Sequence, residues 1–142
     1  MIEFNYETNF ILPNEDELRN WVETIIKNKN CKVGEINYIF CDDEYLHKLN
    51  VEFLNHDTLT DIISFDNTVG KIISGDIFIS IERVKENASE YNVTFNEELN
   101  RVMIHGVLHY LGFKDKTEEE QILMRNEENN ALNILNNSKS DK

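Results

Sequence analysis

The sequence predicts an α+β domain in which about five helices pack over a small mixed β-sheet of about four strands. Three observations lead to this fold class. Segments with strand-like alternation and segments with helical spacing of apolar residues are mixed along the chain rather than grouped. The segment 95–111 is apolar on most sides, which is typical of a central helix. The 142 residues are 40% hydrophobic, which is enough for the core of one domain.

The expected elements follow from the periodicity of apolar residues and from turn and capping residues. Strands are expected near residues 2–7, 33–41, 61–65 and 71–80. Helices are expected at 14–28, from Asp42 to the polar loop at 55–60, at 81–91, from Thr94 to Leu111, and from Thr117 to near Leu135. A single domain at residues 1–137 is expected, followed by a flexible tail at 138–142.

In the first half of the chain, the spacing of apolar residues separates helix from strand. The apolar residues of the first helix share one face: Leu18, Trp21, Val22, Ile25 and Ile26. In the strand that follows, Ile36, Tyr38 and Phe40 alternate with other residues. Asp42 is suited to cap the next helix. That helix is expected to carry four apolar residues inward: Tyr45, Leu46, Leu49 and Phe53.

In the second half of the chain, turn and capping residues set the boundaries. A turn at residues 67–70 separates two strands, and Gly75 in the second of them is a candidate bulge. Two segments, Thr94–Glu97 and Thr117–Glu120, match the capping-box pattern at the starts of the last two helices.

The charge balance limits the partners of the protein. Asp and Glu total 27 against 14 Lys and Arg, which gives a net charge of −13. This field should repel polyanions and anionic membranes, so any nucleic-acid site must overcome it locally. We expect no signal peptide and no membrane span. Cys31 and Cys41 flank one strand and are expected to be reduced, as in a cytoplasmic enzyme.

The segment 105–115, His-Gly-Val-Leu-His-Tyr-Leu-Gly-Phe-Lys-Asp, carries the strongest chemical signal. His105 and His109 are four residues apart on the predicted helix, so their side chains project from the same face. Gly112 suits a left-handed residue after the helix end, which allows the chain to turn back and bring Asp115 to the same point. Two imidazoles and a carboxylate are three ligands for a divalent ion, with a position left for water. Zinc is the first choice, although iron and manganese also accept this ligand set.

The order of these residues is close to that of the metzincin peptidases. Those enzymes need a glutamate directly after the first histidine as general base. Gly106 stands at that position and has no side chain to accept a proton. This disfavours a peptidase but not hydrolysis in general.

Three blocks of the sequence together resemble one known family. In the metal segment, five residues match the family pattern H-G-x-L-H-L-x-G-Y-D-H: His105, Gly106, Leu108, His109 and Gly112. Residues 60–65 (Thr-Asp-Ile-Ile-Ser-Phe) are similar to its block T-D-V-L-S-F, and residues 75–80 (Gly-Asp-Ile-Phe-Ile-Ser) to its block G-D-I-x-I-S. Leu49-Asn50 matches the helix before the second block. The chain thus resembles the bacterial YbeY-type rRNA maturation factors.

This resemblance implies a single-strand-specific, metal-dependent endoribonuclease involved in 16S rRNA 3′-end maturation and 30S ribosome biogenesis in the cytoplasm. It implies one zinc ion per chain, held by the catalytic positions His105, His109 and Asp115. The expected partners are precursor small-subunit rRNA and ribosomal proteins or assembly factors, without a membrane. The alternative is a metal-stabilised ribosome assembly factor with little intrinsic nuclease activity, because an acidic surface attracts basic ribosomal proteins.

The chain departs from the family pattern at two positions. Asp115 stands where the family has a third histidine, and a carboxylate ligand lowers the charge of the centre, so that bound water is acidified less. Leu54 stands where the family usually has an arginine that faces the metal. Without this arginine the site lacks a group that binds two phosphate oxygens at once, which leaves open whether nuclease activity survives.

Other cations near the metal segment are candidates for phosphate binding. Arg101 lies one turn before His105, and Lys114 and Lys116 flank Asp115. The alternative for all three cations is that they are ordinary surface charges.

Five further polar residues are expected near the site. Thr60, Asp61 and Ser64 are candidates to line the substrate cleft, and His56 is a weaker candidate for proton transfer. Asp76 could accept the outer N–H of a metal-bound histidine, as supporting carboxylates do. The alternative for Asp76 is a strand residue bonded to the backbone.

Overall fold

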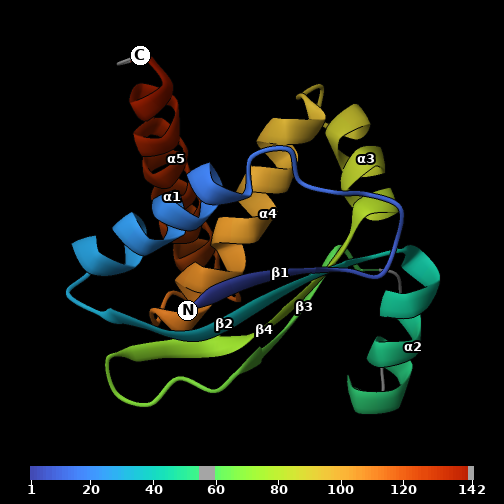
Figure 1. The fold of residues 1–142 in the computed structure, drawn as a ribbon, viewed down its shortest axis with the longest axis horizontal. Coiled ribbons are helices and arrows are strands. Elements are labelled where there is room, and N and C mark those ends of the chain that lie inside the picture. Colours follow the sequence, from blue (N-terminus) through green and yellow to red (C-terminus); the bar gives the residue numbers. More distant parts are fainter. Residues whose placement is uncertain (55–59, 141–142) are drawn as a thin grey trace.

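A mixed sheet with the strand order β1-β2-β4-β3 is the base of the structure (Figure 1). The computed structural model describes residues 1–54 and 60–140, without the side chains at positions 54 and 138–140. Its strands are β1 (Ile2–Tyr6), β2 (Lys32–Cys41), β3 (Ile62–Asp66) and β4 (Ile72–Ser80). β2 pairs in parallel with β1 and β4, whereas β3 runs antiparallel to β4 at one edge.

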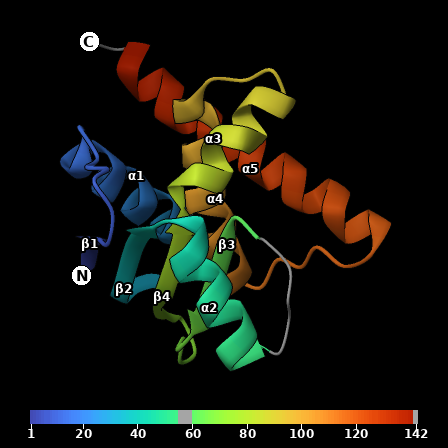
Figure 2. The same cartoon turned by 90° about the vertical axis from the view of Figure 1, so that its right-hand side faces the viewer.

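Five helices in the described part of the chain surround this sheet, and the predicted α+β class with a mixed sheet is confirmed. They are α1 (Glu15–Asn28), α2 (Asp43–Leu54), α3 (Ile81–Glu90), α4 (Phe95–Tyr110) and α5 (Glu118–Ser140). Figure 1 and Figure 2 show α1, α3, α4 and α5 on one side of the sheet, with α2 apart from them beside β3 and β4. None of the helices described here is both long and apolar enough to cross a membrane.

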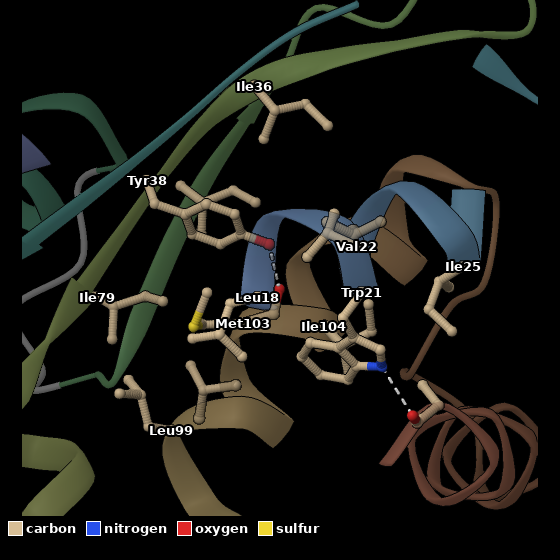
Figure 3. Close-up of a cluster of buried hydrophobic side chains, with 14 of the residues drawn as sticks. Leu18, Trp21, Val22, Ile25, Ile36, Tyr38, Ile79, Leu99, Met103 and Ile104 are labelled. Atoms are coloured by element: carbon tan, nitrogen blue, oxygen red, sulfur yellow. Dashed lines mark hydrogen bonds between the residues drawn. The ribbon is translucent and has the colours of Figure 1, made fainter. Parts of the chain in front are cut away.

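The main core lies between the sheet and α4, as the sequence predicts for a central helix. Side chains from alternate positions of β2 and β4 point into it together with seven residues of α4: Leu99, Val102, Met103, Ile104, Val107, Leu108 and Tyr110. Burial of each such side chain contributes on the order of 1.5–3 kcal/mol. Figure 3 shows two polar groups that are satisfied inside this core. The Tyr38 hydroxyl donates to the Met103 carbonyl oxygen (2.9 Å), and Trp21 Nε1 donates to the Ala131 carbonyl oxygen (2.8 Å). They fix α4 to the sheet and α1 to α5.

The C-terminal end of α4 is fixed to the sheet by Tyr110. Its hydroxyl is 3.1 Å from the carbonyl oxygens of both Phe65 and Asp76. Gly75 lies directly beneath the ring, and a Cβ there would be 2.5 Å from Tyr110 Cζ and 2.4 Å from the Phe65 carbonyl oxygen. The bulge expected at Gly75 is therefore wrong, because the register irregularity lies between Val33 and Ile36 on β2. Instead, the lack of a side chain at Gly75 leaves room for the Tyr110 ring.

The predicted caps are present in the structure. The Tyr45 amide donates to Asp42 Oδ1 (2.8 Å) at the start of α2, and the Glu97 amide donates to the Thr94 hydroxyl (3.1 Å) at the start of α4. At the start of α5, two reciprocal bonds complete the capping box: the Glu120 amide donates to the Thr117 hydroxyl, and the Thr117 amide donates to Glu120 Oε1. Both cysteines are free, as expected.

Two expectations about the helices need correction. On α2, Leu46 is buried, but Tyr45 is 38% exposed and Phe53 is 60% exposed. The reason is that α2 covers only the β3–β4 part of the sheet, so these rings contact Phe78 and Phe65 at its margin. The last helix runs to Ser140, beyond its expected end near Leu135. Its final turns contain no proline or glycine that would end a helix.

Candidate metal centre

Helix α4 presents His105 and His109 on the face that is turned away from the sheet. The residues between and beside them, Ile104, Val107 and Leu108, are fully buried against the core. Because the buried stripe fixes the rotation of the helix, both imidazoles point outward from one side, one turn apart. Their Nε2 atoms are 3.0 Å from each other.

Gly112 turns the chain back toward the two histidines. Its φ of +103° is accessible to glycine at little cost, and its amide donates to the His109 carbonyl oxygen (3.0 Å). The next amide, that of Phe113, donates to the Leu108 carbonyl oxygen (3.0 Å), and the Phe113 ring packs against the core. This reversal places Asp115 Oδ2 3.2 Å from the Nε2 atoms of both His105 and His109.

The three side-chain atoms form a triangle suited to a divalent cation. Its edges are 3.0, 3.2 and 3.2 Å. Tetrahedral coordination with bonds of about 2.0–2.1 Å puts neighbouring donor atoms about 3.3 Å apart. The triangle therefore fits one face of such a tetrahedron, and the fourth corner points away from the three donors. The donor set and the spacing agree with a metal site, and His105, His109 and Asp115 are the residues that could hold the ion.

A carboxylate that the sequence reasoning missed supports His105 from behind. Glu128 of α5 is buried, and its Oε2 is 2.6 Å from His105 Nδ1. A carboxylate accepts from Nδ1 only when that nitrogen carries the proton, which leaves the Nε2 lone pair for a metal. Arg101 donates to the other oxygen of Glu128 (3.0 Å). The arrangement is a chain from Arg101 through Glu128 to the ligand.

In the absence of a metal, His105 and Glu128 shift each other's pKa. Burial lowers the pKa of His105, but the hydrogen bond and charge of Glu128, with the charge of Asp115, raise that pKa overall. Burial raises the pKa of Glu128, but the hydrogen bonds from His105 and Arg101 lower it overall. Each group thus favours the charged form of the other.

The sequence contained one signal for Glu128. It lies in the apolar row of α5, among four buried residues: Met124, Ala131, Leu132 and Leu135. A single carboxylate in such a row has to be paired inside the protein. The spacing indicates that a partner exists but does not indicate which residue it is.

Asp76, the sequence candidate for this supporting role, lies elsewhere. It accepts from Asn37 Nδ2 (3.0 Å). Ile77, its neighbour on β4, points into the core under α4, and strand residues alternate, so Asp76 faces the opposite side of the sheet. Glu128, not Asp76, contacts the outer nitrogen of His105.

The three cations expected at the substrate cleft differ in their exposure to solvent. Arg101 is only 17% exposed, and its two terminal nitrogens donate to Glu128 and Asn129. Lys114 is exposed in the loop before Asp115, and Lys116 is exposed after it.

Two of the remaining candidates are described by the structure in detail. Ser64 is exposed on β3, opposite Ile77 of β4, and its side chain lies beside the Tyr110 hydroxyl. The Thr60 hydroxyl donates to the Ile62 carbonyl oxygen (3.3 Å). His56 and the side chain at position 54 lie outside the described residues.

Two cavities flank His105. The larger, which we call the α5 cavity, measures about 560 Å³ and is lined by Asp115 together with residues of α5. The smaller, the α3 cavity, measures about 240 Å³ and includes Asp61, Tyr91 and Glu98 in its lining. Three residues line both: His105, Arg125 and Glu128. The metal triangle therefore lies at the edge of a groove that continues to both sides.

Two carboxyl groups of the α3 cavity have altered acidity. Burial raises the pKa of Asp61, although backbone hydrogen bonds and His105 lower it in part. Burial also raises the pKa of Glu98, and the nearby charge of Asp61 raises it further. Such shifts are common where a protein prepares a site for a ligand.

Comparison with known proteins agrees with these observations. The family model described as Endoribonuclease YbeY matches residues 2–136. A curated relative from Flavobacterium johnsoniae, named Endoribonuclease YbeY, is 61% identical over 132 residues, which cover 93% of this chain and 95% of the relative. A relative of the same name from Christiangramia forsetii is 57% identical and covers 94% of each chain.

A solved structure shows the same fold. It is the solution structure of a Thermotoga maritima protein, with a TM-score of 0.68 and 27% identity, and the match covers 100% of this chain and 96% of that one. The family match spans nearly the whole sequence, and the identities are far above the level at which a family is shared. The chain therefore belongs to the YbeY endoribonuclease family.

Proposed function

We propose that this protein is a zinc-dependent endoribonuclease that cuts single-stranded RNA. Its substrate is the precursor of 16S rRNA, whose 3′ end it matures in the cytoplasm during 30S subunit assembly with ribosomal proteins or assembly factors. The observation that carries the proposal is the triangle of His105, His109 and Asp115 at the edge of an open groove. Membership of a family whose curated members are named endoribonucleases supports RNA hydrolysis as its activity.

A bound zinc ion would act as a Lewis acid on a phosphoryl oxygen and would make water a better nucleophile at neutral pH. The protein residues prepare the site for this. Glu128 holds His105 in the tautomer with a proton on Nδ1, and Arg101 balances the negative charge of Glu128. Because two ligands come from one rigid helix, the donor atoms keep their spacing when substrate enters.

The direct test is cleavage of RNA by the zinc-loaded protein. The substrate is a single-stranded RNA that spans the 3′ end of precursor 16S rRNA, and a duplex of the same sequence is the control. We expect the single strand to be cut and the duplex to be spared. His109→Ala should lose both zinc and cleavage, whereas His47→Ala, which removes a histidine of α2 outside the triangle, should keep both. Cleavage that survives His109→Ala would refute the proposal.

The identity and role of the ion are tested separately. Elemental analysis of the purified protein should give one zinc per chain, and His105→Ala should lower that content. Bound iron or manganese instead would keep the site but change the ion. A large loss of thermal stability on chelation without any RNA cleavage would favour a structural metal, which family membership does not favour.

A further inference from the structure

Of the two arginines that line the groove, Arg125 is the exposed one. It lies on α5, its side chain is 61% exposed, and it lines both cavities beside His105. Its ion pair with Glu128 Oε1 spans 3.8 Å, which is too long for a hydrogen bond. Its donors are therefore available to a ligand in the groove.

The other three arginines of the sequence are engaged elsewhere. Arg101 donates to Glu128 and Asn129 and is largely covered. Arg19 donates to the Ile2 carbonyl oxygen and to Asp16. Arg83 donates to Asp43 and Glu86, and it is not among the residues that line either cavity. An anion that enters the groove thus meets one exposed guanidinium.

The local charges favour such a cation. The protein carries a net charge of −13, and three carboxylates line the α3 cavity: Asp61, Glu98 and Glu128. A polyanion approaching this surface is repelled unless a cation faces it. A planar guanidinium can bind two phosphate oxygens at once, which lysine cannot do. Arg125 has the position and the exposure for this role.

We propose that Arg125 binds a backbone phosphate of single-stranded RNA that crosses His105, with one flank of the strand in each cavity. In the α3 cavity, Tyr91 is 59% exposed and gives an aromatic surface on which an unpaired base stacks. This inference rests on the proposed function, since it assumes that the ligand of the groove is RNA. To that function it adds the residues that bind the RNA strand and the two cavities in which the strand lies.

The test uses the zinc-loaded, full-length protein and its Arg125→Ala variant. Loss of a charged hydrogen bond to phosphate should lower kcat/KM for single-stranded RNA about 10- to 100-fold. The salt dependence of RNA binding should become shallower by about one in its logarithmic slope. Zinc content should stay at the wild-type level, because the ion pair of Arg125 is with Glu128 and not with one of the three metal ligands. Arg125→Lys should recover part of the loss, because lysine restores the positive charge but cannot bind two phosphate oxygens at once.

Two matched variants complete the design. Lys85→Ala removes an exposed cation from α3 that lines neither cavity, and it should behave as wild type. Tyr91→Ala should weaken binding, whereas Tyr91→Phe, which keeps the ring, should not. An equal loss in Arg125→Ala and Lys85→Ala would overturn the inference, since it would show a general effect of charge. A wild-type kcat/KM in Arg125→Ala would also overturn it.

A binding measurement separates this inference from the proposed function. The probe is a fluorescently labelled, phosphorothioate-modified single-stranded RNA that resists hydrolysis. If the wild-type protein cuts no RNA but binds this probe, and Arg125→Ala loses binding, the proposed function fails and the inference stands. If both proteins bind the probe equally, the inference fails whatever the cleavage assay gives.

Discussion

The two faces of α4 hold their side chains in different ways. Toward the core, Met103, Ile104, Val107 and Leu108 are fully buried and are positioned by close packing. Toward the groove, His105 and His109 are partly exposed and are positioned by polar contacts with Glu128 and Asp115. One helix thus combines a face that stabilises the fold with a face that could hold a metal ion. The comparison predicts that stability and metal affinity can be changed separately.

The largest expected effect is on the core face. Leu108→Ala leaves a cavity in the main core and should reduce the free energy of unfolding by about 2–5 kcal/mol, measured by urea denaturation. The zinc content of the fraction that remains folded should not change. The matched control is Leu123→Ala on α5, where the leucine is half exposed, and it should cost far less. A loss of zinc from folded Leu108→Ala would break the separation of the two faces.

On the groove face, we expect a substitution to lower zinc affinity rather than the stability of the fold. Glu128→Gln keeps the shape of the side chain but removes its charge from His105 Nδ1. Changes to such supporting residues typically lower metal affinity about 10- to 100-fold, and zinc competition against a chromophoric chelator measures this. The control is Glu127→Gln, since Glu127 pairs with Lys29 rather than with a ligand. Unchanged zinc affinity in Glu128→Gln would contradict the role of the hydrogen bond.

A smaller effect is expected where the two faces meet. Tyr110→Phe removes the hydroxyl that fixes the end of α4 to Phe65 and Asp76. The loss of this bond should cost about 1 kcal/mol in unfolding free energy. Because the ring still fills the space above Gly75, zinc affinity should change little. A large fall in zinc affinity would show that the position of His109 depends on this bond.

The pH dependence of the metal-free protein gives the finest test. The raised pKa of His105 stabilises the folded state below the ordinary histidine value of 6.5, and this contribution is lost as pH rises through the folded pKa. The lowered pKa of Glu128 stabilises it above the ordinary value of 4.5, and that contribution is lost as pH falls through the folded pKa. Both act together between pH 4.5 and 6.5. Thermal melting should show a stability gain in this range that Glu128→Gln reduces.

The parts of the site that could be predicted are those set by local geometry. The four-residue spacing of His105 and His109, the left-handed Gly112 and the return of Asp115 all lie within one short segment, so helix geometry alone brings them together. Glu128 comes from another helix, and its contact with His105 depends on how α5 packs across α4. Packing between distant segments is not encoded in any short pattern, so this residue was missed.

The same reasoning applies to the fold. The strands and helices were predictable because alternation and helical spacing are local. The strand order was not, because it depends on pairing between residues far apart in the chain. The sides of the sheet were also hard to predict, which explains why Tyr45 and Phe53 are more exposed than expected. For Asp76, the alternation along β4 becomes informative only once the side of the sheet that faces α4 is known.

The position of Glu128 in the last helix has a consequence for biosynthesis. A nascent polypeptide that has reached only residue 117 already contains both imidazoles and Asp115, but it has no buried acid to orient the first ring. Domains form from the N-terminus as translation proceeds. We therefore expect a newly made molecule to become able to retain an ion only after α5 has left the ribosome.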